Sequence, residues 1–352
     1  MDGRNGLADQ CFGNCILDKA APLLHYNHME NAIDIFAPRF SNEDAAREHL
    51  EALHWSDGPV CPHCGSFNAK RLPPQKRKAT KAHPGGTVRK GVVQCNDCRQ
   101  QYTVTVGTVF ERSKVPLNKW LLVNHLLCSS KKGMSAHQIA RMIGVTYKTA
   151  WFMMHRIREA MKDTDQGPIG GYGKTVEADE TYVGGKVKNR HKGKRHGENK
   201  SPFHQKQPVI SLVERGGKVR SFHVAKVTGP LLRQVLVTNA HRGSWLMTDD
   251  HNGYKAAGKE YVGHGVVKHS LGEYGRSGVF HTNTIEGFFS IFKRGIIGVY
   301  HHVSEAHLKR YAVEFDFRYN TRKMNDFERS TEALKGARGK RLTYRRPVAA
   351  AA

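Results

Sequence analysis

The amino-acid sequence predicts an α/β domain preceded by two small modules, one bounded by cysteines and one helical. Two Cys-x-x-Cys pairs mark the first module, and two short helix-like segments on either side of Gly144 mark the second. Alternating β-rich and helix-like runs across residues 175–268 then indicate a sheet flanked by helices. We therefore expect five regions, which are residues 1–40, 41–110, 111–165, 172–325 and 326–352.

The charge of the chain favours a polyanionic partner such as DNA over a neutral small molecule. The 352 residues include 56 Lys and Arg against 31 Asp and Glu, which gives a net charge of +25. The alternative is a protein that is merely cationic at its surface. No apolar run approaches the roughly 20 residues that cross a bilayer, and no signal peptide begins the chain. We therefore expect a cytoplasmic protein without a membrane partner.

The two ends of the chain differ from the regions between them. Residues 1–28 show no clear periodicity, and residues 1–40 are expected to be an extension that is partly disordered. Ser41 is the expected N-cap of the first helix, with Asp44 in its first turn. Residues 326–352 are basic, end in a run of alanines, and are expected to form a disordered tail.

The cysteine-bounded module has the spacing of a zinc ribbon. Cys61 and Cys64 form one Cys-x-x-Cys pair, and Cys95 and Cys98 form another 30 residues later. Two such pairs supply four thiolates for a tetrahedral, structural Zn²⁺, and a reducing compartment keeps them free of disulfides. The intervening residues 65–94 hold eight Lys or Arg and no acidic residue. They form either a loop that contacts DNA phosphate or a solvated insertion, and the sequence favours neither.

The helical module has the pattern of a helix-turn-helix. Ser135 and Thr146 are expected to cap two helices that meet at Gly144, and the second helix can then enter a major groove. An ordinary helical hairpin is the alternative. The residues expected to face outward and contact DNA are Tyr147, Lys148, Thr149, Phe152 and Arg156. The residues expected in the core are Ile139, Ala140, Ile143, Val145, Ala150, Met153, Met154 and Ile157.

A helix expected near residues 282–293 has one polar face and one apolar face. At about 100° per residue, its polar residues fall within roughly 80° of one another. These polar residues are Asn283, Glu286, Ser290 and Lys293.

Two aspartates lie upstream on segments with strand character. Asp179 lies on the strand expected over residues 174–183, and Asp249 ends the strand expected over residues 245–249. Glu177 shares the face of Asp179 and is expected to support it, whereas strand alternation directs Glu180 to the opposite face. Carboxylates that converge from two strands and a helix can hold divalent metal. A basic loop with Lys192, Lys194 and Arg195 follows the first strand, and we expect it to contact DNA.

Three segments together resemble the DDE transposases of bacterial insertion sequences, in the ISXO2-like branch where a zinc ribbon precedes a ribonuclease-H-like domain. They are Glu177-Ala-Asp-Glu-Thr-Tyr-Val-Gly-Gly185, Thr248-Asp-Asp-His-Asn-Gly-Tyr254 and Asn283-Thr-Ile-Glu-Gly-Phe-Phe-Ser-Ile-Phe-Lys-Arg-Gly295. The resemblance covers roughly residues 40–325. It implies a mixed sheet with flanking helices, and two Mg²⁺ or Mn²⁺ ions held by Asp179, Asp249 and Glu286. It also implies that Lys293 contacts phosphate near the transposon end.

The activity implied by this resemblance is binding of terminal inverted repeats, metal-dependent 3′-end cleavage and strand transfer into target DNA. By analogy, the protein acts as a homo-oligomer, at least a dimer, near the nucleoid. Asn283 shares the polar helix face and is an auxiliary candidate beside Glu286. Two further functions stay open: a catalytically silent, transposase-derived DNA-binding regulator, and a nuclease that only hydrolyses DNA.

Overall fold

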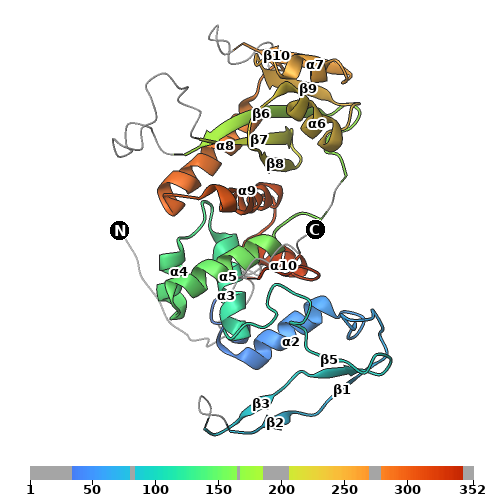
Figure 1. The fold of residues 1–352 in the computed structure, drawn as a ribbon, viewed down its shortest axis with the longest axis vertical. Coiled ribbons are helices and arrows are strands. Elements are labelled where there is room, and N and C mark those ends of the chain that lie inside the picture. The colour runs from blue at the N-terminus through green and yellow to red at the C-terminus, as the bar shows by residue number, and fades with distance from the viewer. Residues whose placement is uncertain (1–33, 80–83, 165–166, 185–205, 269–278, 344–352) are drawn as a thin grey trace, which may run out of the picture. The chain divides into compact units, whose positions relative to one another are not determined.

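The computed structural model describes residues 34–79, 84–164, 167–184, 206–268 and 279–343, whose elements Figure 1 shows in chain order. Most of the expected N-terminal extension and the last nine residues of the expected tail lie outside these ranges. No helix within the described ranges is long and apolar enough to cross a membrane.

The four-cysteine module consists of two helices, a three-stranded antiparallel sheet and a separate hairpin. Its elements are α1 (Pro38–Ser41), α2 (Glu43–His54), β1 (Ala69–Arg71), β2 (Gln75–Arg77), β3 (Thr87–Arg89), β4 (Val93–Cys95) and β5 (Gln101–Tyr102). The expectation that Ser41 caps a helix is wrong, because the Asn42 side chain accepts from the backbone N of Asp44 at 2.8 Å. The basic segment between the cysteine pairs contains the β2–β3 hairpin, which the sequence did not predict.

The helical module has the two helices and the turn that the sequence predicts. Its elements are α3 (Leu117–Ser129), α4 (Ala136–Ile143) and α5 (Tyr147–Ala160). Ser135 and Thr146 cap α4 and α5 through their side chains. Gly144 ends α4 in the left-handed conformation, with φ of 66°, which a residue without Cβ adopts at low cost. All eight residues expected in the core pack in its hydrophobic cluster, with Val145 only partly buried.

The α/β domain is a five-stranded mixed sheet in the order β10-β9-β6-β7-β8. Its strands are β6 (Thr175–Val183), β7 (Gln207–Glu214), β8 (Val219–His223), β9 (Trp245–Asp249) and β10 (Gly263–Val267). Strands β6, β7 and β8 pair antiparallel, whereas β9 runs parallel to β6 and β10 runs parallel to β9. Asp179 therefore lies on the central strand, and Asp249 lies at the carboxyl end of its neighbour.

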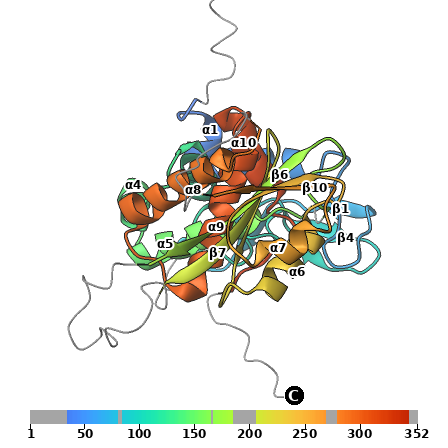
Figure 2. The same cartoon turned by 90° about the horizontal axis from the view of Figure 1, so that it is seen from above.

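Two sets of helices cover the two faces of this sheet (Figure 1, Figure 2). The helices are α6 (Gly229–Asn239), α7 (Tyr254–Gly258), α8 (Asn283–Gly295), the π-helix η4 (Ile296–Tyr300) and α9 (Glu305–Asn320). Val176 and Ala178 of β6 pack with α6 and α7. Val183 of β6 packs in a second cluster with α8, η4 and α9. Strand alternation thus assigns odd-numbered residues of β6, including Asp179, to the α8 side.

The segment expected to be a disordered tail begins with a helix, α10 (Asp326–Lys335). Asn325 and Glu328 form a capping box at its start, and Ala333 and Leu334 are buried. Asn124 of α3 donates to the Ser330 carbonyl at 3.0 Å. The prediction of a disordered tail is therefore wrong over these residues, because α10 packs on α3 of the helical module, which is distant in the sequence.

Candidate active site

The candidate site lies where the pairing between β6 and β9 ends. Ala178 pairs with Thr248, and the next residues along the two parallel strands are Asp179 and Asp249. Their carboxylate oxygens, with one from Glu180, lie within 4.8 Å of one another. The structure therefore brings together the two aspartates that the sequence singled out, from segments 70 residues apart in the chain.

Glu180 belongs to this carboxylate cluster, although strand alternation argued against it. Its side chain does lie on the α7 side of the sheet, where Tyr254 Oη donates to Glu180 Oε2 at 2.8 Å. The pairing of β6 with β9 ends at Ala178, so β9 does not lie between the Asp179 and Glu180 side chains, although they start on opposite faces of β6. The adjacent acidic pair Asp179-Glu180 was the available sequence signal.

The electrostatics of this carboxylate cluster suit a divalent cation. Burial, followed by the charge of Asp249, raises the pKa of Asp179 to about 8. Burial also raises the pKa of Glu180, and Asp249 adds to the effect. Carboxylates that repel one another in a partly buried place gain from a cation that all of them can ligate.

Helix α8 is anchored to the sheet by Glu177. This carboxylate is fully buried and accepts from the backbone N of Ile285 and from Thr284 Oγ1, both at 2.9 Å. Arg215 Nε donates to the same carboxylate at 2.6 Å. Glu177 thus supports the site from the face of Asp179, as expected, by binding the positive end of α8.

Glu286 lies one turn into α8 and is not part of the 4.8 Å group of carboxylates. Its charge makes the smallest of the contributions that raise the pKa of Asp179. The side chain is exposed and accepts from Thr282 Oγ1 at 2.9 Å. Asn283 is the first residue of α8 and is also exposed.

The amphipathic pattern predicted for α8 is confirmed. Lys293 is exposed two turns beyond Glu286 and lines a cavity with Lys132 and Arg294. The buried residues of this helix are Ile285, Phe288, Phe289, Phe292 and Gly295.

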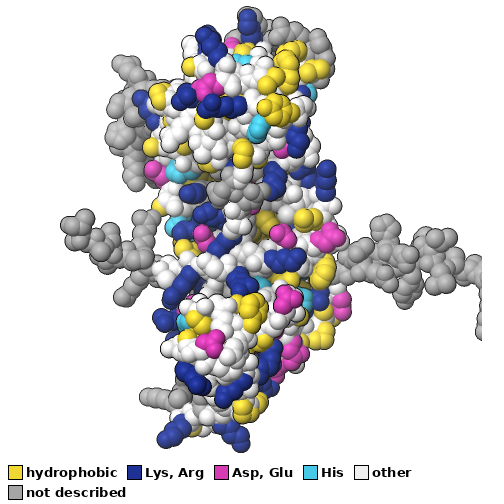
Figure 3. Space-filling view, turned by 90° about the vertical axis from the view of Figure 1, so that its right-hand side faces the viewer, with side chains coloured by type: hydrophobic (Ala, Val, Ile, Leu, Met, Phe, Trp, Pro, Cys, Tyr) yellow, Lys and Arg dark blue, Asp and Glu magenta, His cyan; other side chains and the backbone are white. Residues whose placement is uncertain are grey.

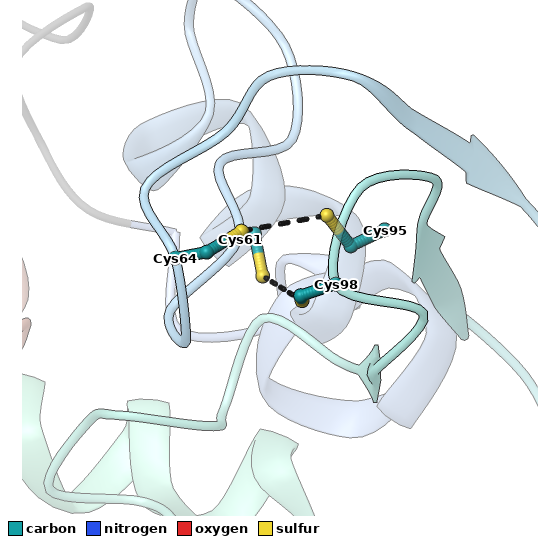
Figure 4. Close-up of side chains that lie close together, drawn as sticks. All are labelled: Cys61, Cys64, Cys95 and Cys98. Carbon is teal, nitrogen blue, oxygen red and sulfur yellow. Dashed lines mark hydrogen bonds between the residues drawn. The ribbon is translucent and has the colours of Figure 1, made fainter.

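The four predicted zinc ligands converge in the four-cysteine module (Figure 4). The Sγ atoms of Cys61 and Cys98 are 3.6 Å apart, as are those of Cys64 and Cys95. All four sulfurs lie within 4.8 Å of one another. A tetrahedral ion with Zn–S bonds of about 2.3 Å requires sulfur separations of about 3.8 Å, so this arrangement fits zinc.

The residues expected to contact DNA divide into four groups. Tyr147 and Lys148 are exposed at the start of α5, and Thr149 and Phe152 are half-buried. Arg156 is 6% exposed, so the expectation that it faces outward is wrong. Its guanidinium lies 5.2 Å from the Trp120 ring centroid and donates to the Glu111 carbonyl at 2.7 Å. The last three candidates, Lys192, Lys194 and Arg195, lie outside the described residues.

Basic side chains are spread over the surface beyond these candidates. Figure 3 shows Lys and Arg, in dark blue, distributed over one face of the molecule with fewer Asp and Glu between them. This agrees with the net charge of +25.

Comparison with known proteins relates the four-cysteine module and the α/β domain to transposases. Residues 41–101 match the model of a transposase zinc-ribbon domain, and residues 170–320 match that of an ISXO2-like transposase domain. A protein described as an uncharacterized protein in transposable element ISH50 of Halobacterium salinarum is 29% identical over 296 residues. The alignment covers 79% of this chain and 91% of that relative. The chain thus belongs to the insertion-sequence transposases that carry a zinc ribbon ahead of an ISXO2-like transposase domain.

Proposed function

We propose that this protein catalyses transposition of its insertion sequence. It binds the terminal inverted repeats, cleaves the 3′ ends of the element and joins them to target DNA. The observation that carries the proposal is the convergence of the Asp179 and Asp249 carboxylates in a chain of this family. A silent DNA-binding regulator has no need of such a carboxylate cluster.

Asp179, Asp249 and Glu286 are the residues that would hold two Mg²⁺ or Mn²⁺ ions, since hard cations prefer carboxylate oxygens. Two such ions, when bound, activate the attacking oxygen and stabilise the leaving oxygen of a phosphodiester. Glu177 keeps α8, and with it Glu286, aligned with β6. Glu180 accepts from Tyr254 Oη and contributes a third carboxylate oxygen beside Asp179 and Asp249.

The sheet supports a ribonuclease-H-like fold for this domain. Three antiparallel strands followed by two parallel ones place one aspartate on the central strand and the other on the strand beside it. Glu286 lies on α8, which packs against β6 and β7 of the same sheet. That arrangement allows three short segments, far apart in sequence, to supply the ligands of one site.

Recognition of the element ends is assigned to the N-terminal modules. Helices α4 and α5 would act as a helix-turn-helix that presents Tyr147, Lys148, Thr149 and Phe152 to DNA. Zinc bound by the four cysteines would hold the ribbon together, because a module with so small a core gains its stability from the metal. Pairing of two element ends requires at least a dimer, which would act near the nucleoid in the cytoplasm.

The decisive experiment is cleavage and joining of labelled DNA that carries the inverted repeats. Asp179→Asn, Asp249→Asn and Glu286→Gln should each abolish Mg²⁺-dependent activity while end binding persists. Glu180→Gln should reduce activity, since Glu180 is the third carboxylate of the cluster with Asp179 and Asp249. Full strand transfer by Glu286→Gln, with loss in Asn283→Ala, would assign the third ligand to Asn283 instead.

Two other outcomes would overturn the proposal itself. Binding of the ends without any cleavage by the wild-type protein would favour the silent regulator. Cleavage without joining, under conditions with target DNA in excess, would favour a nuclease that only hydrolyses.

A further inference from the structure

A cavity of about 590 Å³ lies at the far end of α8 from Glu286. Lys132, Ser290, Lys293, Arg294 and Ile297 line it, and we call it the η4 hollow. Three of these five residues are cations, and none of the residues that line it is acidic. Among the described residues, none of these three cations forms an ion pair. A hollow with this charge fits an anionic ligand.

Lys132 lies in the loop between α3 and α4 of the helical module. Two glycines, Gly295 and Gly133, allow this loop to lie close to α8 and η4. A Cβ on Gly295 would lie 2.9 Å from the Lys132 carbonyl oxygen, so only glycine lets this loop approach α8. Gly133, with φ of +94°, packs against Tyr300 so closely that a Cβ would meet Tyr300 Oη at 1.9 Å. The Lys132 carbonyl and Gly133 therefore lie close against α8 and η4.

The backbone of η4 is irregular and firmly held. It is a π-helix, a form that recurs at functional sites, and His301 after it adopts φ of 58°. Tyr300, its last residue, donates to Glu314 Oε1 at 2.6 Å and packs edge-on against Tyr311. This rigid turn leaves Ile297 70% exposed, one helical turn beyond Lys293 and Arg294.

We propose that the η4 hollow is a second DNA contact, in which Lys132 and Arg294 join Lys293 in binding backbone phosphate while Ile297 packs against the adjacent base. The proposal rests on the proposed function and extends it. Proteins that bend DNA commonly combine basic side chains with an exposed aliphatic wedge in this way. The hollow would thus couple the helix that reads the element end to the helix that carries Glu286.

The geometry sets where along the DNA this contact should fall. Seven residues separate Glu286 from Lys293, which is about 10 Å along the axis of α8. Successive nucleotides of one strand advance about 3.4 Å along the duplex, so with α8 alongside the DNA axis the hollow would meet a phosphate roughly three steps from the one at Glu286.

The test is binding of inverted-repeat DNA in which single phosphates near the cleavage site are replaced by neutral methylphosphonate. One replacement about three nucleotides from that site should weaken binding by the wild-type protein, and Lys132→Ala should remove the penalty. Lys132→Ala should also lower the slope of log affinity against log salt by about 1. Lys131→Ala is the matched control, because Lys131 is exposed in the same loop but does not line the hollow.

The wedge is tested with 2-aminopurine placed beside the same phosphate. Its fluorescence should rise when the wild-type protein binds and should rise less with Ile297→Ser. Val262→Ser is the control, since Val262 is 62% exposed and far from the hollow in the sequence.

Failure of this inference is distinguishable from failure of the proposed function. A wild-type protein that does not bind or cleave the element ends would contradict the function itself. If the wild-type protein binds and cleaves, but Lys132→Ala behaves like Lys131→Ala at every methylphosphonate position, only the η4 hollow is refuted. Equal fluorescence with Ile297→Ser and the wild-type protein would refute the wedge.

Discussion

Replacement of Glu314 by alanine should strongly destabilise the folded chain. Its carboxylate is fully buried and accepts from Arg158 Nε and Tyr300 Oη, both at 2.6 Å, and from Arg318. Arg158 is itself 1% exposed, and its guanidinium lies 4.1 Å from the Tyr311 ring centroid. The carboxylate therefore joins α5 of the helical module to α9 of the α/β domain.

The expected cost is about 3–5 kcal/mol, because the alanine leaves buried guanidinium groups without their counter-charge. The pKa of Glu314 gives a separate measure. Burial acts to raise it, but Arg158 and Arg318 outweigh burial and lower it from 4.5 to about 2. A fall of that size means that the ionised carboxylate stabilises the folded chain by about 3 kcal/mol more than the protonated form does.

The same pKa sets how the stabilisation depends on pH. Because the folded pKa lies below the unfolded value, the contribution is complete above about pH 4.5 and is lost as the pH falls toward 2. The free energy of unfolding of the wild-type protein should therefore decrease over this range, and Glu314→Ala should lack that part of the decrease.

The measurement is urea-induced unfolding followed by circular dichroism at pH 7 and at steps down to the lowest pH where the wild-type protein stays folded. Glu332→Ala is the control, since Glu332 is exposed on α10 and its loss should change stability by less than about 0.5 kcal/mol. If the two variants unfold at the same urea concentration at pH 7, the assigned role of Glu314 is refuted.

Three further predictions concern the N-terminal modules. Cys61→Ser should release bound zinc and unfold the ribbon, measured by metal content and circular dichroism. Gly133→Ala should cost about 2–4 kcal/mol, because the new Cβ meets Tyr300 and φ is positive, whereas Gly144→Ala has open space and should cost about 1–2 kcal/mol in thermal unfolding. Arg156→Ala should lower stability by about 2 kcal/mol and leave DNA affinity of the folded protein unchanged, because its side chain is buried.

Each of these predictions has a control or an outcome that contradicts it. The Cys128→Ser protein should retain zinc in the ribbon, because the buried Cys128 thiol belongs to the core of the helical module. Equal destabilisation by the two glycine variants would mean that the loop does not press against Tyr300. Lys148→Ala should weaken DNA binding without loss of stability, and the reverse pattern would exchange the roles assigned to Lys148 and Arg156.

Local chemistry explains what the sequence predicted well. The caps at Ser135 and Thr146, the left-handed turn at Gly144 and the apolar face of α8 depend on residues within one or two turns. The cysteine pairs are likewise defined by spacing, and the match to a transposase zinc-ribbon domain confirms that module. The order of strands and helices over residues 175–249 followed the same periodic patterns.

Long-range contacts explain what the sequence missed. Arg156 has the spacing of an outward residue on α5, but the Trp120 ring and the Glu111 carbonyl cover it. The polar segment at 326–335 becomes helix α10 because it packs against α3. Glu180 joins Asp179 and Asp249 because β9 ends beside it. In each case the deciding neighbour comes from a distant part of the chain.

The sequence by itself determined the zinc-ribbon and transposase modules, the helix caps and the residue types of the candidate site. Those properties arise from spacing and periodicity, which are written along the chain. The tertiary structure decided which carboxylates meet, which arginines are buried and where Lys132 lies relative to Lys293. Those properties depend on burial and on the distances between segments remote in sequence, and no local pattern encodes them.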